Sequence, residues 1–211
     1  MKEKFSPRVT GIEISGIRRI FEAAGPDSIN LGLGQPDFDT PQHIKDAAIQ
    51  AINEGKTGYT ANTGIPELRS AICGKFKKEN GLSYTPDQLI VTAGASEALH
   101  IVMQALVTEG DRVLCADPGF VSYSALATIA GGRPVGVPLD KKLQIDVEQA
   151  KELMDGARLF VLNSPGNPTG AVEPKDSIRA IVEYANDCNV TVVSDEVYEH
   201  FIYGKEHWSA A

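Results

Sequence analysis

The sequence predicts an α/β fold, with a mostly parallel sheet covered by helices on both faces. Five short apolar, β-branched runs alternate along the chain with longer segments of helical periodicity; they lie at 89–92, 112–115, 134–137, 158–162 and 191–194. Strands that alternate with helices form βαβ units, whose strands run parallel and are buried on both faces. The 211 residues are enough for one domain with a substantial core, or about one and a half domains of average size.

Composition and charge exclude several function classes. The formal net charge of −8 argues against nucleic acid or an anionic membrane as partner. No apolar run is long enough to span a bilayer, and the charged start Met1–Lys4 has no apolar stretch behind it, so we expect no signal peptide. Cys73, Cys115 and Cys188 are odd in number and far apart, and the four histidines lack metal-ligand spacing. These features predict a cytoplasmic protein without a disulfide framework or metal site.

The first third of the chain contains three predicted helical segments. Residues 6–24 have apolar positions at helical spacing and predict an arm or first helix, which ends at Gly25-Pro26. A second helix begins with Thr40 as N-cap and Pro41 at the first helical position, and ends at Gly55. Its inward face should carry Ile44, Ala47, Ala48, Ala51 and Ile52. A third helix runs from Pro66 to about Asn80 and is ended by Gly81.

The remaining helices each follow a predicted strand. The strand Leu89–Thr92 leads into a helix through Leu106, and the strand 112–115 leads into a helix at 120–130. Asp146 is placed to begin an amphipathic helix, and a further helix runs from Pro174 to about Asp187. We see no internal repeat, low-complexity segment or flexible linker.

The stretch Asn163–Gly170 (Asn-Ser-Pro-Gly-Asn-Pro-Thr-Gly) directly follows the buried strand at 158–162. Proline fixes φ, restricts the residue before it and permits a cis peptide bond, so this segment predicts a rigid turn. Open α/β sheets hold their ligands at the carboxyl ends of their strands. An ordinary Pro/Gly connection to the next helix is the alternative.

The next strand delivers Asp195 and, three residues later, Tyr198 to the same edge. With these two stretches the chain resembles the fold-type I aminotransferases of class I/II, in which an N-P-x-G turn and a D-x-x-Y follow successive strands. The resemblance implies the three-layer αβα fold of the large domain of these enzymes. It also implies pyridoxal 5′-phosphate (PLP) as cofactor, and transfer of an amino group between an amino acid and a 2-oxo acid.

The resemblance gives Asp195 the clearest role. A carboxylate beside the pyridine nitrogen keeps that nitrogen protonated, and the protonated ring is the electron sink for the reaction. By the same resemblance, Tyr198 and Asn167 hydrogen-bond the 3-oxygen of the ring, and Asn167 also contacts substrate. For Asp195 the alternative is a helix N-cap at a strand end.

Gly94, Ala95 and Ser96 lie where a strand passes into a helix, with small side chains at the helix N-terminus. Free N–H groups and the helix dipole favour an anion there, and the resemblance makes these residues the phosphate-binding turn. Ser96 could instead be an N-cap-region serine. It could also be the nucleophile of an α/β-hydrolase, with Asp195 and His200 or His207 downstream, although the second glycine of that motif is an alanine.

Three further positions take cofactor or substrate roles from the resemblance. Phe120 would stack on the pyridine ring, Tyr59 would reach the cofactor phosphate of the neighbouring subunit in a homodimer, and Gly34 would offer its N–H to the substrate carboxylate. The alternatives are a core phenylalanine, a tyrosine packed in a loop and a glycine in a tight turn.

The Schiff-base lysine of the family, in an S-x-x-K segment well after the D-x-x-Y, has no match in this chain; Lys205 lies only ten positions after Asp195, in a different context. The substrate-clamping arginine near the family's C-terminus has no match either. The resemblance therefore covers about the first half of the family's length. It assigns residues 1–35 to an arm associated with the small domain and 36–211 to the N-terminal part of the large domain.

The full fold has two later strands between the strand near Leu89 and the strand near Phe160, so their edges would lack partners here. We therefore expect a truncated product that alone binds PLP weakly, if at all, and is inactive. A PLP-dependent C–S or other lyase of the same fold and a non-catalytic pseudo-aminotransferase fragment are the remaining alternatives.

Overall fold

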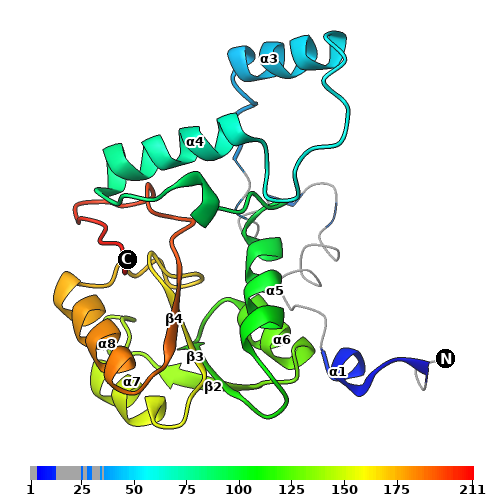
Figure 1. The fold of residues 1–211 in the computed structure, drawn as a ribbon. Coiled ribbons are helices and arrows are strands. Elements are labelled where there is room, and N and C mark those ends of the chain that lie inside the picture. The colour runs from blue at the N-terminus through cyan, green and yellow to red at the C-terminus, as the bar shows by residue number, and fades with distance from the viewer. Residues whose placement is uncertain (1–3, 13–24, 26–27, 30–33, 35) are drawn as a thin grey trace. The chain divides into compact units, whose positions relative to one another are not determined.

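The computed structural model describes residues 4–12, 25, 28–29, 34 and 36–211. The chain divides into two compact units. One unit comprises Met1–Ile12, Lys75–Ser83 and Thr92–Ala211, and the other comprises Glu13–Gly74 and Tyr84–Val91. Figure 1 labels the elements of both units.

The larger unit is built on a four-stranded sheet of β1 (Arg112–Asp117), β2 (Arg133–Pro138), β3 (Leu159–Asn163) and β4 (Thr191–Asp195). The strand order is β2-β1-β3-β4, and all three pairings are parallel. This confirms the predicted parallel α/β sheet. The expectation that the strand near Phe160 would have an unpaired edge is wrong, because β3 is paired with β1 on one side and with β4 on the other. The register of β3 and β4 places Asn163 opposite Asp195, so the two strands end side by side.

Helices cover both faces of this sheet, which confirms the three-layer prediction (Figure 1). α5 (Ala95–Leu106) and α6 (Val121–Ile129) share one buried core with the sheet, and α7 (Val147–Met154) and α8 (Lys175–Asp187) share the other. Strand side chains alternate between the two cores. The first core receives Val113, Cys115, Leu159 and Val161, and the second receives Leu114, Phe160 and Leu162.

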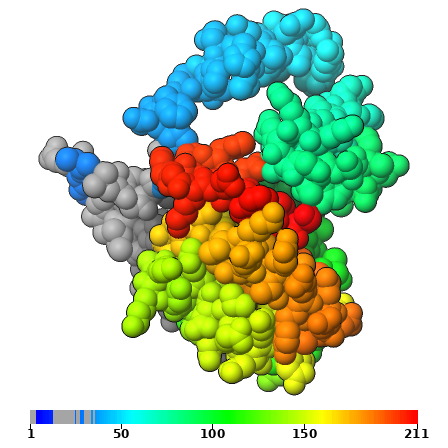
Figure 2. Space-filling view, turned by 90° about the vertical axis from the view of Figure 1, so that its left-hand side faces the viewer, coloured from blue at the N-terminus to red at the C-terminus, as the bar shows by residue number. Residues whose placement is uncertain are grey.

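The starts of α7 and α8 follow the predicted signals. Asp146 is the N-cap of α7, where its carboxylate accepts from the backbone N–H of Gln149 at 3.1 Å. Pro174 directly precedes α8, which buries Ile178, Ile181 and Ala185 as its periodicity predicts. The C-terminal residues lie next to the start of α8, and in Figure 2 the red segment borders the orange one. Ala210 packs there against the core beneath α7 and α8.

The predicted strand at Leu89–Thr92 is wrong. A 3₁₀ turn, η3 (Pro86–Gln88), precedes these residues, and they form no strand. The N–H of Val91 donates instead to the carbonyl of Thr63, which lies in a loop. An apolar run needs a neighbouring strand to form a ladder, and the described part of the chain supplies none at this position.

The smaller unit contains α3 (Gln42–Asn53), η3 and α4 (Pro66–Lys75), apart from the last residue of α4, which is assigned to the larger unit. α3 starts one residue later than predicted, because Pro41 is the capping residue and Thr40 is not. The predicted inward face of α3 is also wrong. None of its residues is buried, and Ile44 and Ile52 are 50% and 66% exposed, because no described element covers them.

The third predicted helix forms in two pieces. α4 is followed by a π-helical turn, η2 (Phe76–Asn80), and Gly81 ends it with a left-handed φ of 71°, where glycine is favoured. The N-terminal segment includes a short helix, α1 (Pro7–Thr10), while positions 13–24 of the predicted first helix lie outside the described residues. Within the described ranges, no helix is both long and apolar enough to cross a bilayer.

We predict that Phe160→Ala destabilises the larger unit by about 3–5 kcal/mol, because it empties a fully buried position in the central strand β3. Urea unfolding monitored by circular dichroism measures this loss. The matched control is Ile101→Ala on α5, where the side chain is 39% exposed and the expected cost is under about 1.5 kcal/mol. Equal losses for the two variants would contradict this account of the core.

Candidate functional site

The carboxyl ends of β3 and β4 are joined by hydrogen bonds beyond the regular ladder. The side-chain amide of Asn163 donates to the carbonyl of Asp195 at 2.9 Å, and the N–H of Ser164 donates to the same oxygen at 3.3 Å. Asn163 also accepts from the N–H of Asn167 at 2.9 Å. One side chain thus ties the turn after β3 to the last residue of β4.

The carboxylate of Asp195 is held from two sides. The hydroxyl of Tyr123, which extends from α6, donates to Oδ2 at 2.8 Å, and the N–H of Val197 donates to Oδ1 at 3.3 Å. Tyr123 is only 2% exposed. Burial and the adjacent Asp195 carboxylate raise the pKa of the Tyr123 phenol well above its usual value, so the phenol remains a donor near neutral pH.

The predicted pair Asn167 and Tyr198 is brought together at the same edge. The side-chain amide of Asn167 donates to the Tyr198 hydroxyl at 3.3 Å, which joins the turn after β3 to the turn after β4. The peptide bonds Ser164-Pro165 and Asn167-Pro168 are both cis. Asp195, Asn167 and Tyr198 therefore form one polar group built from two adjacent strand ends.

Phe120 lies at the start of α6, and its ring meets the ring of Tyr123 edge to face, with centroids 5.5 Å apart. The turn before it requires glycine, since a Cβ on Gly119 would lie 2.2 Å from the carbonyl oxygen of Ala116. A pocket opens beside these residues; its lining includes Phe120, Tyr123, Asn163, Gly166, Asn167 and Glu173. Two aromatic rings and the polar side chains of Asn163, Asn167 and Glu173 thus line one cavity.

Gly94, Ala95 and Ser96 form the start of α5, as predicted, with Gly94 as the capping residue at a φ of 80°. All three residues are exposed. Among the described residues, no hydrogen bond joins them to Asp195, Asn167 or Tyr198. Leu99, one turn further on, packs in the same core as Tyr123, so α5 covers the sheet face from which Tyr123 reaches Asp195.

Tyr59 and Gly34 belong to the smaller unit, and both are exposed. Tyr59 lines a shallow depression with the neighbouring residues 60–62 and with Leu68. Their predicted roles toward a cofactor and a substrate remain predictions.

The hydrolase alternative is not assembled by the described residues. The Asp195 carboxylate is bonded to Tyr123, while His207 Nε2 lies 3.0 Å from Glu196. His200 Nε2 lies 3.6 Å from Oε1 of Glu199. No hydrogen bond in the described part of the chain joins Ser96 to either histidine, so Ser96 has no general base among the described residues.

Sequence reasoning assigned no role to three residues of this site: Tyr123, Asn163 and Glu173. Tyr123 stands three residues after Phe120 on a helix, and this spacing places both on one face. Asn163 is the last residue of a buried strand, where a polar side chain was the available signal. Nothing in the sequence pattern indicated that Glu173 is buried.

Glu173 is 4% exposed and lines the pocket. Its Oε1 accepts from the N–H of Ile145 at 2.9 Å, its own N–H donates to the Ser164 hydroxyl at 3.0 Å, and its Oε2 has no hydrogen-bond partner among the described residues. Burial raises the pKa of Glu173 to about 7; the nearby Asp140 adds to the rise, while the Ile145 amide and the charge of Lys205 oppose it.

Comparison with known proteins gives a consistent result. A sequence model of the family "Aminotransferase class I and II" matches residues 26–211. A probable aspartate aminotransferase of Methanocaldococcus jannaschii is 48% identical over 97% of this chain and 55% of its own length. A solved Thermus thermophilus aspartate aminotransferase double mutant superposes with a TM-score of 0.93 at 41% identity, covering 98% of this chain and 56% of that one. A Pyrococcus furiosus alanine aminotransferase gives 0.91 at 34% identity, over 98% and 56%.

The chain thus spans about half the length of the relatives it matches.

We predict that Glu173→Gln removes a pH dependence of stability. Because the folded-state pKa of about 7 exceeds the ordinary 4.5, the folded state binds more protons between these values, and wild-type stability falls as pH rises through this window. The variant should match wild type near pH 5 and exceed it near pH 8 by about 2–3 kcal/mol.

Urea unfolding at both pH values measures the difference, with Glu183→Gln on the exposed face of α8 as control. A Glu173→Gln variant with the same pH slope as wild type would contradict the buried, proton-binding carboxyl.

Proposed function

The chain belongs to the family of class I and II aminotransferases, and we propose that its site binds PLP for the transfer of an amino group between an amino acid and a 2-oxo acid. The observation that carries the proposal is the convergence of Asp195, Asn167 and Tyr198 at the adjacent ends of β3 and β4. The M. jannaschii and T. thermophilus relatives are named aspartate aminotransferases and the P. furiosus relative an alanine aminotransferase, which supports an amino acid as substrate.

The residues present fit the pyridine end of PLP. Asp195 supplies a fixed carboxylate for a protonated ring nitrogen, because an opposite charge in a shielded site favours the charged form of its partner. Because the pKa of Tyr123 is raised, its phenol stays neutral and donates to Oδ2 of Asp195, so Asp195 supplies the negative charge of this pair. Tyr123 thus holds the carboxylate in one orientation.

The Asn167 and Tyr198 side chains fit the 3-oxygen of the ring, to which each can donate a hydrogen bond. Bound PLP supplies an electron sink for removal of the substrate's α-proton. Phe120 supplies an aromatic face, which gains about 0.5–1.5 kcal/mol from stacking beyond area burial. These residues of the chain therefore bind the ring, orient it and exclude water from one of its faces.

The phosphate and the substrate would use other residues. The start of α5 at Gly94, Ala95 and Ser96 offers a favourable dipole to the phosphate, with the N–H groups of Ala95 and Ser96 as donors, while the Gly94 N–H is bonded to the Thr92 carbonyl at 2.8 Å. We assign Tyr59 to the phosphate in a partner subunit of a homodimer, which its full exposure supports. Gly34 and Asn167 would contact the substrate carboxylate.

Two further assignments complete the proposal. The three free cysteines, Cys73, Cys115 and Cys188, support a cytoplasmic location. No S-x-x-K segment occurs in residues 1–211, so PLP should bind this chain without a covalent bond, and the chain alone should not turn over.

We predict that Asp195→Asn weakens PLP binding by about 10- to 100-fold, the loss expected when a charged hydrogen bond becomes a neutral one. PLP fluorescence titration of the chain measures this loss. Asp176→Asn in the first turn of α8 is the control and should bind as wild type does.

Borohydride treatment followed by mass spectrometry should leave no PLP on the denatured chain. Equal affinity of the Asp195→Asn variant and wild type would contradict the role of Asp195, and a borohydride-fixed adduct would contradict non-covalent binding.

A further inference from the structure

We propose that Glu196 is a positioning residue that fixes the end of β4, and with it Asp195, by binding the C-terminal residues His207–Ala210. The importance of this for catalysis rests on the proposed function, while the positioning itself can be tested without a cofactor. We call the group of Glu196, Ser194, His207, Ser209 and Ala210 the Glu196 node.

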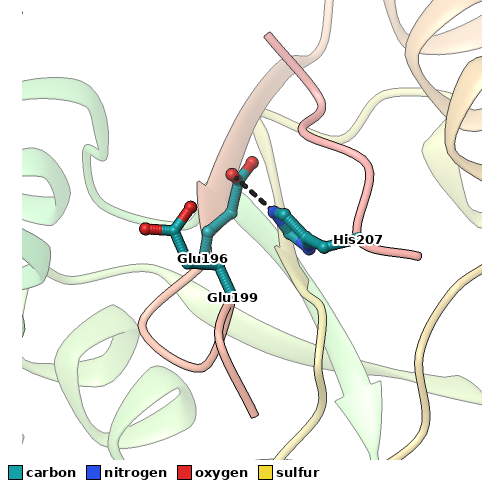
Figure 3. A group of neighbouring side chains, drawn as sticks. All are labelled: Glu196, Glu199 and His207. Carbon is teal, nitrogen blue, oxygen red and sulfur yellow. Dashed lines mark hydrogen bonds and ion pairs between the residues drawn. The ribbon is translucent and has the colours of Figure 1, made fainter. Parts of the chain in front are cut away.

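Four donors converge on the Glu196 carboxylate. The hydroxyls of Ser194 and Ser209 donate to Oε1 at 2.6 and 2.9 Å, and the N–H of Ala210 donates to the same oxygen at 3.1 Å. His207 Nε2 lies 3.0 Å from Oε2, and Figure 3 shows the imidazole ring directed at this carboxylate. The side chains of Glu196 and His207 are 20% and 11% exposed.

The Glu196 node requires an ionised glutamate. Burial by itself raises the pKa of Glu196, but the hydrogen bonds from Ser194, His207, Ser209 and the Ala210 amide outweigh it and hold the pKa below its usual value. A carboxylate can only accept, so His207 must carry its proton on Nε2. Charge-assisted hydrogen bonds of this kind are about twice as strong as neutral ones.

The other side of the Glu196 node is firmly anchored. The ammonium of Lys175, at the start of α8, lies 3.8 Å from the ring centroid of Trp208. Ala210 packs against the core beneath α7 and α8. Residues 207–210 therefore connect Glu196 to α8, on the side of the strand end away from Tyr123.

The regular pairing of β4 ends just before Glu196. Among the described strands its sole neighbour is β3, and the pairing ends at Asp195. Beyond that point, the bond from the Val197 N–H to Asp195 Oδ1 depends on the conformation of the intervening Glu196. Fixing Glu196 therefore fixes the direction of the Asp195 carboxylate.

A metal site at the same place is the alternative. Ligand atoms of Glu196, Glu199 and His207 lie within 4.8 Å of one another (Figure 3). However, Glu199 already accepts hydrogen bonds from the ammonium of Lys75 and the amide of Asn80. The Glu196 carboxylate likewise already has four donors within the chain. A divalent cation would have to displace these partners and lie close to a lysine charge, so the contacts favour the hydrogen-bonded Glu196 node.

Hydrogen exchange measured by NMR on the full chain without cofactor tests the proposal. Glu196→Ala should raise exchange at the amides of Ser164 and Val197, which both donate to Asp195, by at least about tenfold relative to the Val161 amide in the central strand. Glu196→Gln, which retains an acceptor for Ser194, Ser209 and Ala210, should show a smaller rise in the same ratio. If the alanine variant does not fold, the exchange ratio measured in Glu196→Gln tests the proposal instead.

Glu199→Gln is the matched control, since it weakens the bonds from Lys75 and Asn80 four residues beyond Asp195, while no hydrogen bond among the described residues joins Glu199 to residues 207–210. It should lower stability without changing the exchange ratio. An unchanged ratio in both Glu196 variants, or the same rise in Glu199→Gln, would overturn the proposal.

Zinc and manganese titrations distinguish the metal alternative. The Glu196 node predicts no change in melting temperature with either ion or with EDTA, whereas a stabilisation lost in Glu196→Gln would overturn it in favour of a metal site. PLP titration of wild type is read separately. If PLP fails to bind while the exchange ratios respond as expected, the proposed function fails and the positioning role stands.

Discussion

The structure depends most on the register between β3 and β4. Pairing of Asn163 with Asp195 ends the two strands together, so the turn carrying Asn167 and the turn carrying Tyr198 begin at the same level. A slip of one residue would rotate every β4 side chain to the opposite face of the sheet and turn Asp195 away from Tyr123. The buried side chains of β3 alternate between the two cores, and Val192 and Val193 of β4 pack half-buried against one core each, which makes that slip costly.

The site is then refined by contacts that do not belong to the sheet. Tyr123 reaches Asp195 from a helix, Asn163 joins the two strand ends, and the Glu196 node holds the outer side of β4. Tyr123 restrains Oδ2 of Asp195 and Asn163 restrains its carbonyl oxygen, while the Glu196 node restrains the residue that follows. Preorganised polar groups of this kind favour a developing or resident charge without further rearrangement of the protein.

Periodicity and capping signals in the sequence were enough to predict the parallel sheet, its helical layers and the starts of α7 and α8. These signals failed at Leu89–Thr92 and on the predicted inward face of α3. An apolar pattern predicts that a segment packs against another element, and the described residues contain no element that packs against these two. The strand-end motifs led to Asp195, Asn167 and Tyr198. Tyr123, Asn163 and the buried Glu173 were assigned no role from the sequence because their roles arise from long-range hydrogen bonds and burial, and a glutamate is ordinarily exposed.

The central claim is that the ends of β3 and β4 form a cradle for a protonated pyridine ring. Nitrogen-15 NMR of PLP labelled at the ring nitrogen and bound to the chain tests it most directly. The account predicts a pyridinium signal that persists to a higher pH than in free PLP, because the Asp195 carboxylate stabilises the charged form. A bound ring whose nitrogen titrates as it does in free solution would contradict it.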